Sequence, residues 1–121
     1  MASALNWFEI PATDYDRAVK FYNTVLASEL QPMDMGDGPL MAMFPAEDGI
    51  SGAVIKAEGY TPSADGSVIY LNAGADLSDA LGRVEAAGGQ VLVPKTGIGE
   101  NGFFAFLLDT EGNKVGLHSM G

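Results

Sequence analysis

The chain has 121 residues, 47% of them hydrophobic, and a formal net charge of −10 at pH 7. These values predict one folded domain over residues 1–121, and the charge argues against nucleic acid or an anionic membrane as a partner because their phosphates would repel it. The chain has no cysteine, which excludes disulfides, thiol nucleophiles and thiolate metal sites.

The first half of the chain predicts a strand, a helix and three further strands. Alternating apolar residues predict a strand over residues 5–10, which Pro11 ends. A helix follows, capped by Thr13 or Asp14. Its apolar face, at helical spacing, consists of Tyr15, Ala18, Val19, Tyr22, Val25 and Leu26. Short strands are predicted at about 29–35, 40–44 and 50–57, with turns at 36–38 and 47–49.

The second half predicts the same order of elements after a linker at about 58–66. A strand is predicted over 68–72, and a second helix is expected to continue until Gly88 and Gly89. The apolar positions of that helix are Leu77, Ala80, Leu81 and Val84. The last strands are predicted at 90–94, 103–108 and 114–119. Between them we expect a flexible loop at 97–102 and a tight turn at 109–113.

The two halves are related by an internal repeat. Asp14 and Asp76 precede the two helices at an offset of 62, and Gly52 and Gly116 lie near the module ends at an offset of 64. A repeat of this length is one supersecondary unit used twice. The sequence therefore predicts an α+β fold with module 1 at about 1–57 and module 2 at about 67–121. We expect a ligand cavity between the modules.

Three motifs resemble the vicinal oxygen chelate superfamily, which includes glyoxalases, bleomycin resistance proteins and dioxygenases. They are Asp14-x-x-Arg17-Ala18-x-x-Phe21-Tyr22, Val84-Glu85-Ala86-Ala87-Gly88-Gly89 and Asp109-x-Glu111-Gly112-Asn113. The chain is most similar to small single-domain glyoxalase-like members that carry Gly-Glu-Asn-Gly-Phe-Phe, here residues 99–104. The resemblance implies two β-α-β-β-β modules in a curved, barrel-like mixed sheet, with the helices on the convex side. It also implies a small-molecule ligand and a homodimer, because relatives cover their sheet edges by pairing chains.

Metal-binding relatives place ligands on the first and last strand of each module. Carried over by the motifs, these positions fall on Trp7, Gly52, Gly116 and either Ile69 or Tyr70. An indole nitrogen only donates, glycine has no side chain, and a neutral tyrosine is a poor ligand. We therefore expect no metal and no other cofactor.

The alternation of side chains along a strand predicts which residues face the cavity. Trp7 and Glu9 share one face of the first strand, and Gly116 and His118 share one face of the last. By the same reasoning Gly52, Val54 and Lys56 are assigned to the cavity. The predicted ligand-binding residues are Trp7, Lys56, Tyr70, Asn72, Glu100 and Asn101, the last two from a mobile flap at 97–102. The predicted catalytic residues are Glu9 and His118.

Both predicted catalytic residues also have a plain structural interpretation. Glu9 can form an ion pair with Lys56 or Lys114, and His118 can be a half-exposed residue near the chain end. Four methionines at 33, 35, 41 and 43 alternate on neighbouring strands and are typical of core or interface packing.

Three functions remain open. The favoured one is a small-molecule-binding, glyoxalase-like protein without the family metal site. The alternatives are a metal-dependent lyase, isomerase or dioxygenase-type enzyme that uses Glu9 and His118, and a protein that sequesters a cationic antibiotic. No apolar run reaches the about 18 residues of a membrane span, and no basic segment typical of a secretion signal opens the chain, so we expect a cytoplasmic protein without membrane contact.

Overall fold

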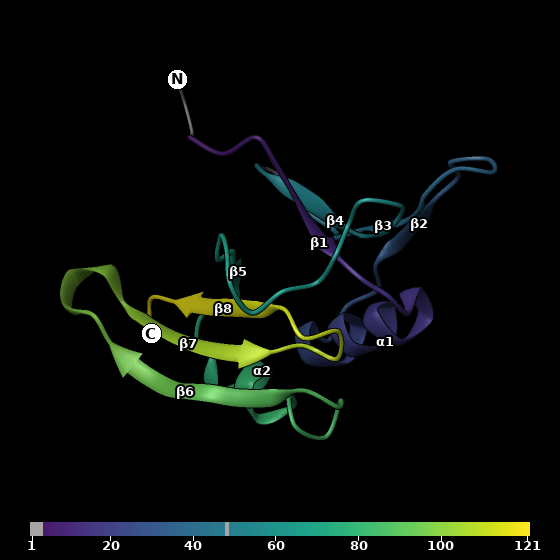
Figure 1. Cartoon of the computed structure of the whole chain (residues 1–121). Helices are drawn as coiled ribbons and strands as arrows, with labels where there is room; N and C mark the ends of the chain where they lie inside the picture. The colour runs from purple at the N-terminus through teal and green to yellow at the C-terminus, as the bar shows by residue number, and fades with distance from the viewer. Residues whose placement is uncertain (1–3, 48) are drawn as a thin grey trace.

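The computed structural model describes residues 4–47 and 49–121 and contains two β-α-β-β-β modules in succession (Figure 1). Module 1 consists of β1 (Trp7–Pro11), α1 (Tyr15–Leu26), β2 (Gln31–Met33), β3 (Leu40–Met43) and β4 (Ser51–Lys56). Module 2 consists of β5 (Tyr70–Asn72), α2 (Ser78–Gly82), β6 (Gln90–Gly97), the 3-10 turn η1 (Gly99–Asn101), β7 (Phe103–Leu108) and β8 (Lys114–Ser119). The predicted α+β class and element order are confirmed. Asp48, in the predicted turn at 47–49, lies outside the described residues.

Each module forms its own four-stranded mixed sheet. The strand order is β1-β4-β3-β2 in the first sheet and β5-β8-β7-β6 in the second. In both sheets the first strand of the module pairs in parallel with the last, and the remaining neighbours are antiparallel. The two sheets stay separate and do not close into a barrel (Figure 1).

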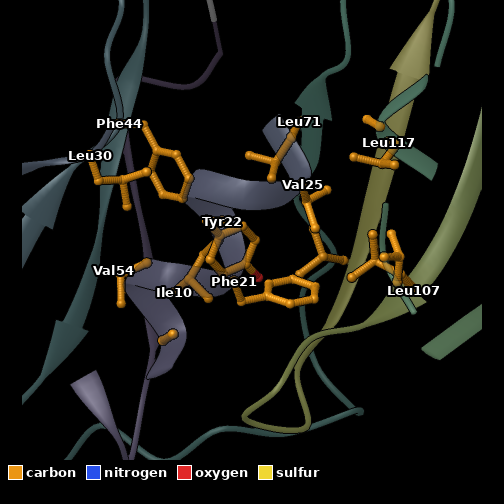
Figure 2. Close-up of a cluster of buried hydrophobic side chains, with 14 of the residues drawn as sticks. Ile10, Phe21, Tyr22, Val25, Leu30, Phe44, Val54, Leu71, Leu107 and Leu117 are labelled. Carbon is orange, nitrogen blue, oxygen red and sulfur yellow. The ribbon is translucent and has the colours of Figure 1, made fainter. Parts of the chain in front are cut away.

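The main hydrophobic core lies between the two sheets, with α1 at its centre (Figure 2). A smaller cluster of Met41, Ala53 and Ile55 is buried on the other face of the first sheet, where Met33 and Ala57 pack against it. The buried face of α1 consists of Ala18, Phe21, Tyr22 and Val25. The same cluster includes Ile10 and Val54 from the first sheet and Leu107 and Leu117 from the second. Both sheets therefore turn one face toward a common core, and their other faces point away from it.

These outward faces are called the open faces. The strand registers place Trp7, Glu9, Ser51, Ala53, Ile55, Met41, Met43 and Met33 on the first open face. They place Tyr70, Asn72, Lys114, Gly116, His118, Phe104, Phe106, Val93 and Thr96 on the second open face. Side chains of paired residues in a sheet point to the same side, which is why the register decides the face.

The assignment of Gly52, Val54 and Lys56 to the cavity face is wrong. Gly52 pairs with Phe8 and Val54 pairs with Ile10, so all three residues lie on the helix-facing side of the first sheet. Val54 has no exposed surface and belongs to the core. The error has a physical cause: the repeat aligns Gly52 with Gly116, but the two glycines lie on opposite kinds of face.

The two helices differ in length and in capping. The carboxylate of Asp14 accepts a hydrogen bond from the backbone of Arg17, and α1 ends at Leu26, with Ala27 in the left-handed region at a φ of 50°. The second helix ends at Gly82 rather than near Gly88; its N-cap residue is Leu77, and the carboxylate of Asp76 accepts from the backbone nitrogen of Ser78 at 2.9 Å. Gly82 is the last residue of this helix, and glycine disfavours helical backbone.

Candidate functional site

An aromatic surface covers the middle of the second open face. The ring centroids of Phe104 and Phe106 lie 5.1 Å apart, and those of Phe106 and Tyr70 lie 5.7 Å apart. The ring of Tyr70 lies over Gly116, where an added Cβ would come within 2.5 Å of ring atom Cδ2. Because Tyr70 is 52% exposed, the outer side of its ring is free for a flat molecule to stack on.

The charge of the second open face differs from that of the whole chain. Lys114 places its Nζ 4.4 Å from the ring centroid of Phe106. Among the described residues, none of the strand side chains on this face is a carboxylate, although the chain has 16 acidic residues. The face is therefore apolar with a cationic side chain and does not repel an electron-rich or anionic ligand.

His118 lies at the end of this face, with its ring orientation fixed by one hydrogen bond. The distance between His118 Nε2 and the backbone oxygen of Asn101 is 2.6 Å. A carbonyl oxygen only accepts, so Nε2 is the donor, and the neutral ring keeps its lone pair on Nδ1. Asn72 is the register partner of His118 across β5 and β8. The structure thus places Tyr70, Asn72, Asn101 and His118 near one another, while Glu100 lies exposed in the same 3-10 turn as Asn101.

Glu9 lies on the first open face, where two side chains donate to its carboxylate. The hydroxyl of Tyr60 donates to Oε1 at 2.9 Å, and Trp7 Nε1 approaches Oε2 at 3.4 Å. The hydrogen bond to Glu9, with its charge, raises the pKa of Tyr60 above the ordinary value. The ion pairs within residues 4–47 and 49–121 are Arg17–Glu111 and Lys95–Asp76, so Glu9 does not pair with a lysine.

The predicted site residues fall into two groups that a single chain does not bring together. Trp7 and Glu9 lie on the first open face, and the group around His118 lies on the second. Among the cavities formed by the described residues, those of about 510 and 1000 Å³ are lined by neither Glu9 nor His118. Lys56 lines the smaller cavity together with Tyr60, whereas Tyr70 and Asn72 lie along the larger one.

The family metal positions do not offer a ligand set. Trp7 and Gly116 lie on open faces, but Gly52 lies on the helix-facing side, and its open-face neighbours are Ser51 and Ala53. None of these side chains is an imidazole or a carboxylate, the usual ligands of zinc and iron outside thiolate sites. The part of the chain that the structure describes also holds no group of three or more histidines, cysteines or acids close enough to bind an ion. The residues present do not fit the family metal.

Sequence reasoning missed a buried polar network that joins α1 to the turn between β7 and β8. Tyr22 donates its hydroxyl to Asp109 Oδ2 at 2.6 Å, and Asn113 Nδ2 donates to the same oxygen at 2.9 Å. Asn113 Nδ2 also donates to the backbone oxygen of Pro11 at 2.7 Å. Burial, followed by the charge of Asp109, raises the pKa of Tyr22 well above its ordinary value, so the phenol remains a neutral donor.

Glu111 extends this network to the N-terminus of α1. It accepts hydrogen bonds from the backbone nitrogens of Thr13 and Asp14 at 2.9 and 2.7 Å, and from Arg17 Nε at 2.8 Å. Burial would raise the pKa of Glu111, but hydrogen bonds from Arg17, Asp14, Thr110 and Thr13 lower it to about 2. The signal available in the sequence was opposite charge, since Arg17 lies in the Asp14–Tyr22 motif and Glu111 in the Asp109–Asn113 motif; in the structure these two motifs contact each other.

Comparison with known proteins agrees with this architecture. The model of the Glyoxalase/Bleomycin resistance protein/Dioxygenase superfamily matches residues 4–117. A glyoxylase-like domain-containing protein of Didymella fabae is 35% identical over 115 residues, covering 90% of this chain and 88% of the relative. The chain therefore belongs to the Glyoxalase/Bleomycin resistance protein/Dioxygenase superfamily.

Solved structures show the same fold at low sequence identity. A glyoxalase/bleomycin resistance protein from Albidiferax ferrireducens T118 superimposes with a TM-score of 0.74 at 19% identity, covering 98% of this chain and all of that one. A glyoxalase-related enzyme from Fulvimarina pelagi gives 0.69 at 15% identity, covering 97% and 88%. Among the described residues, none of the helices has the length and apolar character needed to cross a membrane.

Proposed function

We propose that this chain is a small-molecule-binding, glyoxalase-like protein whose ligand lies on the second open face and which works without a metal. The observation that supports this most is the cluster of tilted and edge-to-face rings formed by Tyr70, Phe106 and Phe104, next to an imidazole with a free acceptor nitrogen on His118. Such a surface suits a flat organic molecule that donates a hydrogen bond to Nδ1. Glu100 and the side chain of Asn101, in the turn beside His118, are proposed as contacts at the edge of this ligand.

The proposal includes a homodimer that completes the site. The first open face carries the partly exposed Met33 and Met43 and the acid Glu9, whereas the second carries aromatic rings, Lys114 and His118. Methionine sulfur packs favourably against aromatic rings, and the charges of the two faces are opposite. A second copy placed with its first open face on this surface would add Trp7 and Glu9 to the group around His118.

A second candidate function is an enzyme of the lyase or isomerase type. The hydrogen bond from Nε2 to Asn101 supports it, because it leaves Nδ1 of His118 able to take a proton from a bound substrate. Glu9 of the second copy is the proposed partner in this reaction. Lys56 lies on the helix-facing side, so we place it outside the site.

Ligand binding is tested with a set of soluble aromatic acids and phenols, measured by calorimetry. Tyr70→Ala is expected to weaken binding by about tenfold, since a base or ring stacked on an aromatic side chain contributes on the order of 1–2 kcal/mol. The matched control is Leu40→Ala, an equally exposed apolar residue of module 1, which should leave affinity unchanged. Equal affinities for wild type and Tyr70→Ala would remove the second open face as the ligand surface.

Two measurements test the remaining parts of the proposal. Elemental analysis of protein purified without added metal is expected to find no stoichiometric Zn²⁺, Ni²⁺ or Fe²⁺. One metal per chain, lost in Glu9→Ala or His118→Ala, would instead support a metal-dependent enzyme. Sedimentation is expected to give a dimer, and a species of 12.6 kDa at all concentrations would contradict the shared site.

A further inference from the structure

The chain contains one Asn-Gly dipeptide, Asn101-Gly102, at the end of the turn η1 between β6 and β7 (Figure 1). A backbone nitrogen attacks the side-chain amide of a preceding asparagine most easily when it belongs to glycine, because glycine has no side chain to hinder the approach. The fold requires glycine here, since Gly102 has a φ of 92° and an added Cβ would lie 2.4 Å from the backbone oxygen of Ser119. Asn101 is therefore always followed by an unhindered nitrogen.

The side chain of Asn101 is exposed and is not held in place. Among the residues that the structure describes, none forms a hydrogen bond with its side-chain amide. By contrast, the side-chain oxygens of Asn23, Asn72 and Asn113 accept from backbone nitrogens at 2.7, 2.9 and 3.1 Å. The amide of Asn101 is therefore free to turn toward the backbone nitrogen of Gly102.

The backbone of Asn101 contacts the one histidine of the chain. Its oxygen accepts from His118 Nε2 at 2.6 Å. The nitrogen of the same peptide bond, that of Gly102, donates to the oxygen of Gly99 at 3.2 Å, the upper end of ordinary N–H···O distances. The peptide bond between Asn101 and Gly102 thus has a firmly paired oxygen and a weakly paired nitrogen.

We propose that Asn101 is a site of spontaneous deamidation to isoaspartate, which replaces the carbonyl that His118 contacts by a carboxylate. The nitrogen of Gly102 attacks Cγ of Asn101, the new N–Cγ bond closes a succinimide ring, and the side-chain nitrogen leaves as ammonia with the proton from Gly102. Water then adds at the former backbone carbonyl carbon, whose bond to Gly102 breaks, and the Gly102 nitrogen regains a proton. The acid formed gives its proton to the ammonia. The backbone now runs through Cγ, and the oxygen beside His118 belongs to a free carboxylate.

The modification adds a negative charge at the end of the second open face. The strand residues paired with His118 are Asn72 on β5 and Phe104 on β7, and neither carries a charge. A hydrogen bond from the imidazole to a carboxylate is stronger than one to a neutral carbonyl. The ring of His118 is therefore expected to respond directly to the change. This inference does not depend on the proposed function, because it needs neither a ligand nor a second copy of the chain.

The test follows the whole chain during incubation at mildly alkaline pH, which favours loss of the Gly102 proton. Peptide mass spectrometry is expected to find conversion of amide to acid at Asn101 at least about tenfold faster than at Asn72, which is followed by alanine and has a bonded side chain. A protein isoaspartate methyltransferase should then label the aged wild type. Equal rates at the two asparagines, or acid at Asn101 without methylation, would overturn the proposal.

Asn101→Gln is the matched control, because its longer side chain would have to close a larger, less favourable ring. The aged variant should gain neither the acid nor the methyl label. Nitrogen NMR of the His118 ring, the one histidine ring in the chain, is expected to show signals that shift on ageing in wild type and stay in the variant. Fresh Asn101→Asp adds a side-chain acid but keeps the backbone carbonyl, so its His118 signals should move less than those of aged wild type. Unmoved His118 signals in isoaspartate-containing protein would overturn the proposed change of hydrogen-bond acceptor, whereas failure of Tyr70→Ala to affect aromatic ligands bears only on the proposed function.

Discussion

The first strands of the two modules, β1 and β5, carry the same aromatic–glycine pair on opposite kinds of face. Phe8 lies opposite Gly52 and Tyr70 lies opposite Gly116, and in both pairs the ring occupies the space that a Cβ would need. The ring of Phe8 is partly buried and packs against the core, with its centroid 5.4 Å from that of Phe44. The ring of Tyr70 is exposed on the second open face.

The difference arises in the connection between strand and helix. The spacing from Phe8 to Asp14 equals that from Tyr70 to Asp76, namely six residues. However, α1 begins one residue after Asp14, whereas α2 begins two residues after Asp76. Gly74, with a φ of 83°, lies in the longer connection and tolerates this backbone. A shift of one residue exchanges the two faces of a strand, so the same pair is buried in one module and presented in the other.

The largest expected effect is that of Gly52→Ala. The new Cβ would lie 2.3 Å from the backbone oxygen of Phe8 and 2.5 Å from Cγ of its ring. The backbone oxygen cannot rotate away, so we expect a loss of about 3 kcal/mol in the free energy of unfolding, measured in urea. An unchanged urea midpoint would show that β1 and β4 separate easily and that the buried pair is not tightly packed.

Tyr22→Phe should have the next largest effect, because it removes a buried hydrogen bond to a carboxylate that anchors α1, whereas the start of α2 is held by the neutral hydroxyl of Ser119. Removing the hydroxyl takes a 2.6 Å hydrogen bond from buried Asp109. We expect a loss of about 1–3 kcal/mol by urea unfolding. The control is Tyr15→Phe on the same helix, which removes a 3.1 Å bond to the neutral backbone oxygen of Met41 and should cost less. Equal losses in both variants would contradict a special role for Asp109.

The Glu111→Gln variant tests the anchoring of α1 through the pH dependence of stability. The pKa of Glu111 is lowered from 4.5 to about 2, so its ionised form stabilises the fold above pH 4.5, and this contribution is lost as the pH falls toward about 2. We expect the variant to lose about 1–2 kcal/mol at pH 7, after allowing for solvent screening, and to converge with wild type toward pH 2. Unfolding curves at several pH values measure this. A difference in the free energy of unfolding between variant and wild type that stays constant with pH would assign the loss to packing. Glu85→Gln, at an exposed position, serves as the control.

Gly116→Ala should have the smallest effect on stability. The three heavy atoms nearest to its Cβ would all be ring atoms of Tyr70, the closest at 2.5 Å, and this exposed ring can rotate away. We expect a loss under about 1 kcal/mol, together with several-fold weaker binding of stacked ligands because the ring is displaced. A loss as large as that of Gly52→Ala would show that the two faces are equally constrained.

The sequence by itself determined the class of fold and most of its elements. Apolar periodicity and the cap at Asp14 predicted α1, and the repeat predicted two modules in the observed order. These features are local residue patterns or spacings along the chain, and both can be seen in a single sequence. Strand parity also grouped Trp7 with Glu9 and Gly116 with His118, because alternation within one strand needs no knowledge of its neighbours.

Only the tertiary structure decided which faces are buried and which residues meet. The repeat could not assign Gly52 to a face, because the connection to each helix shifts the register by one residue. It could not place Glu9 and His118 on separate sheets, because that depends on α1 packing between the two sheets. The contact between Tyr22 and Asp109 spans 87 residues. Such contacts arise from packing of distant segments, which neither periodicity nor motif spacing records.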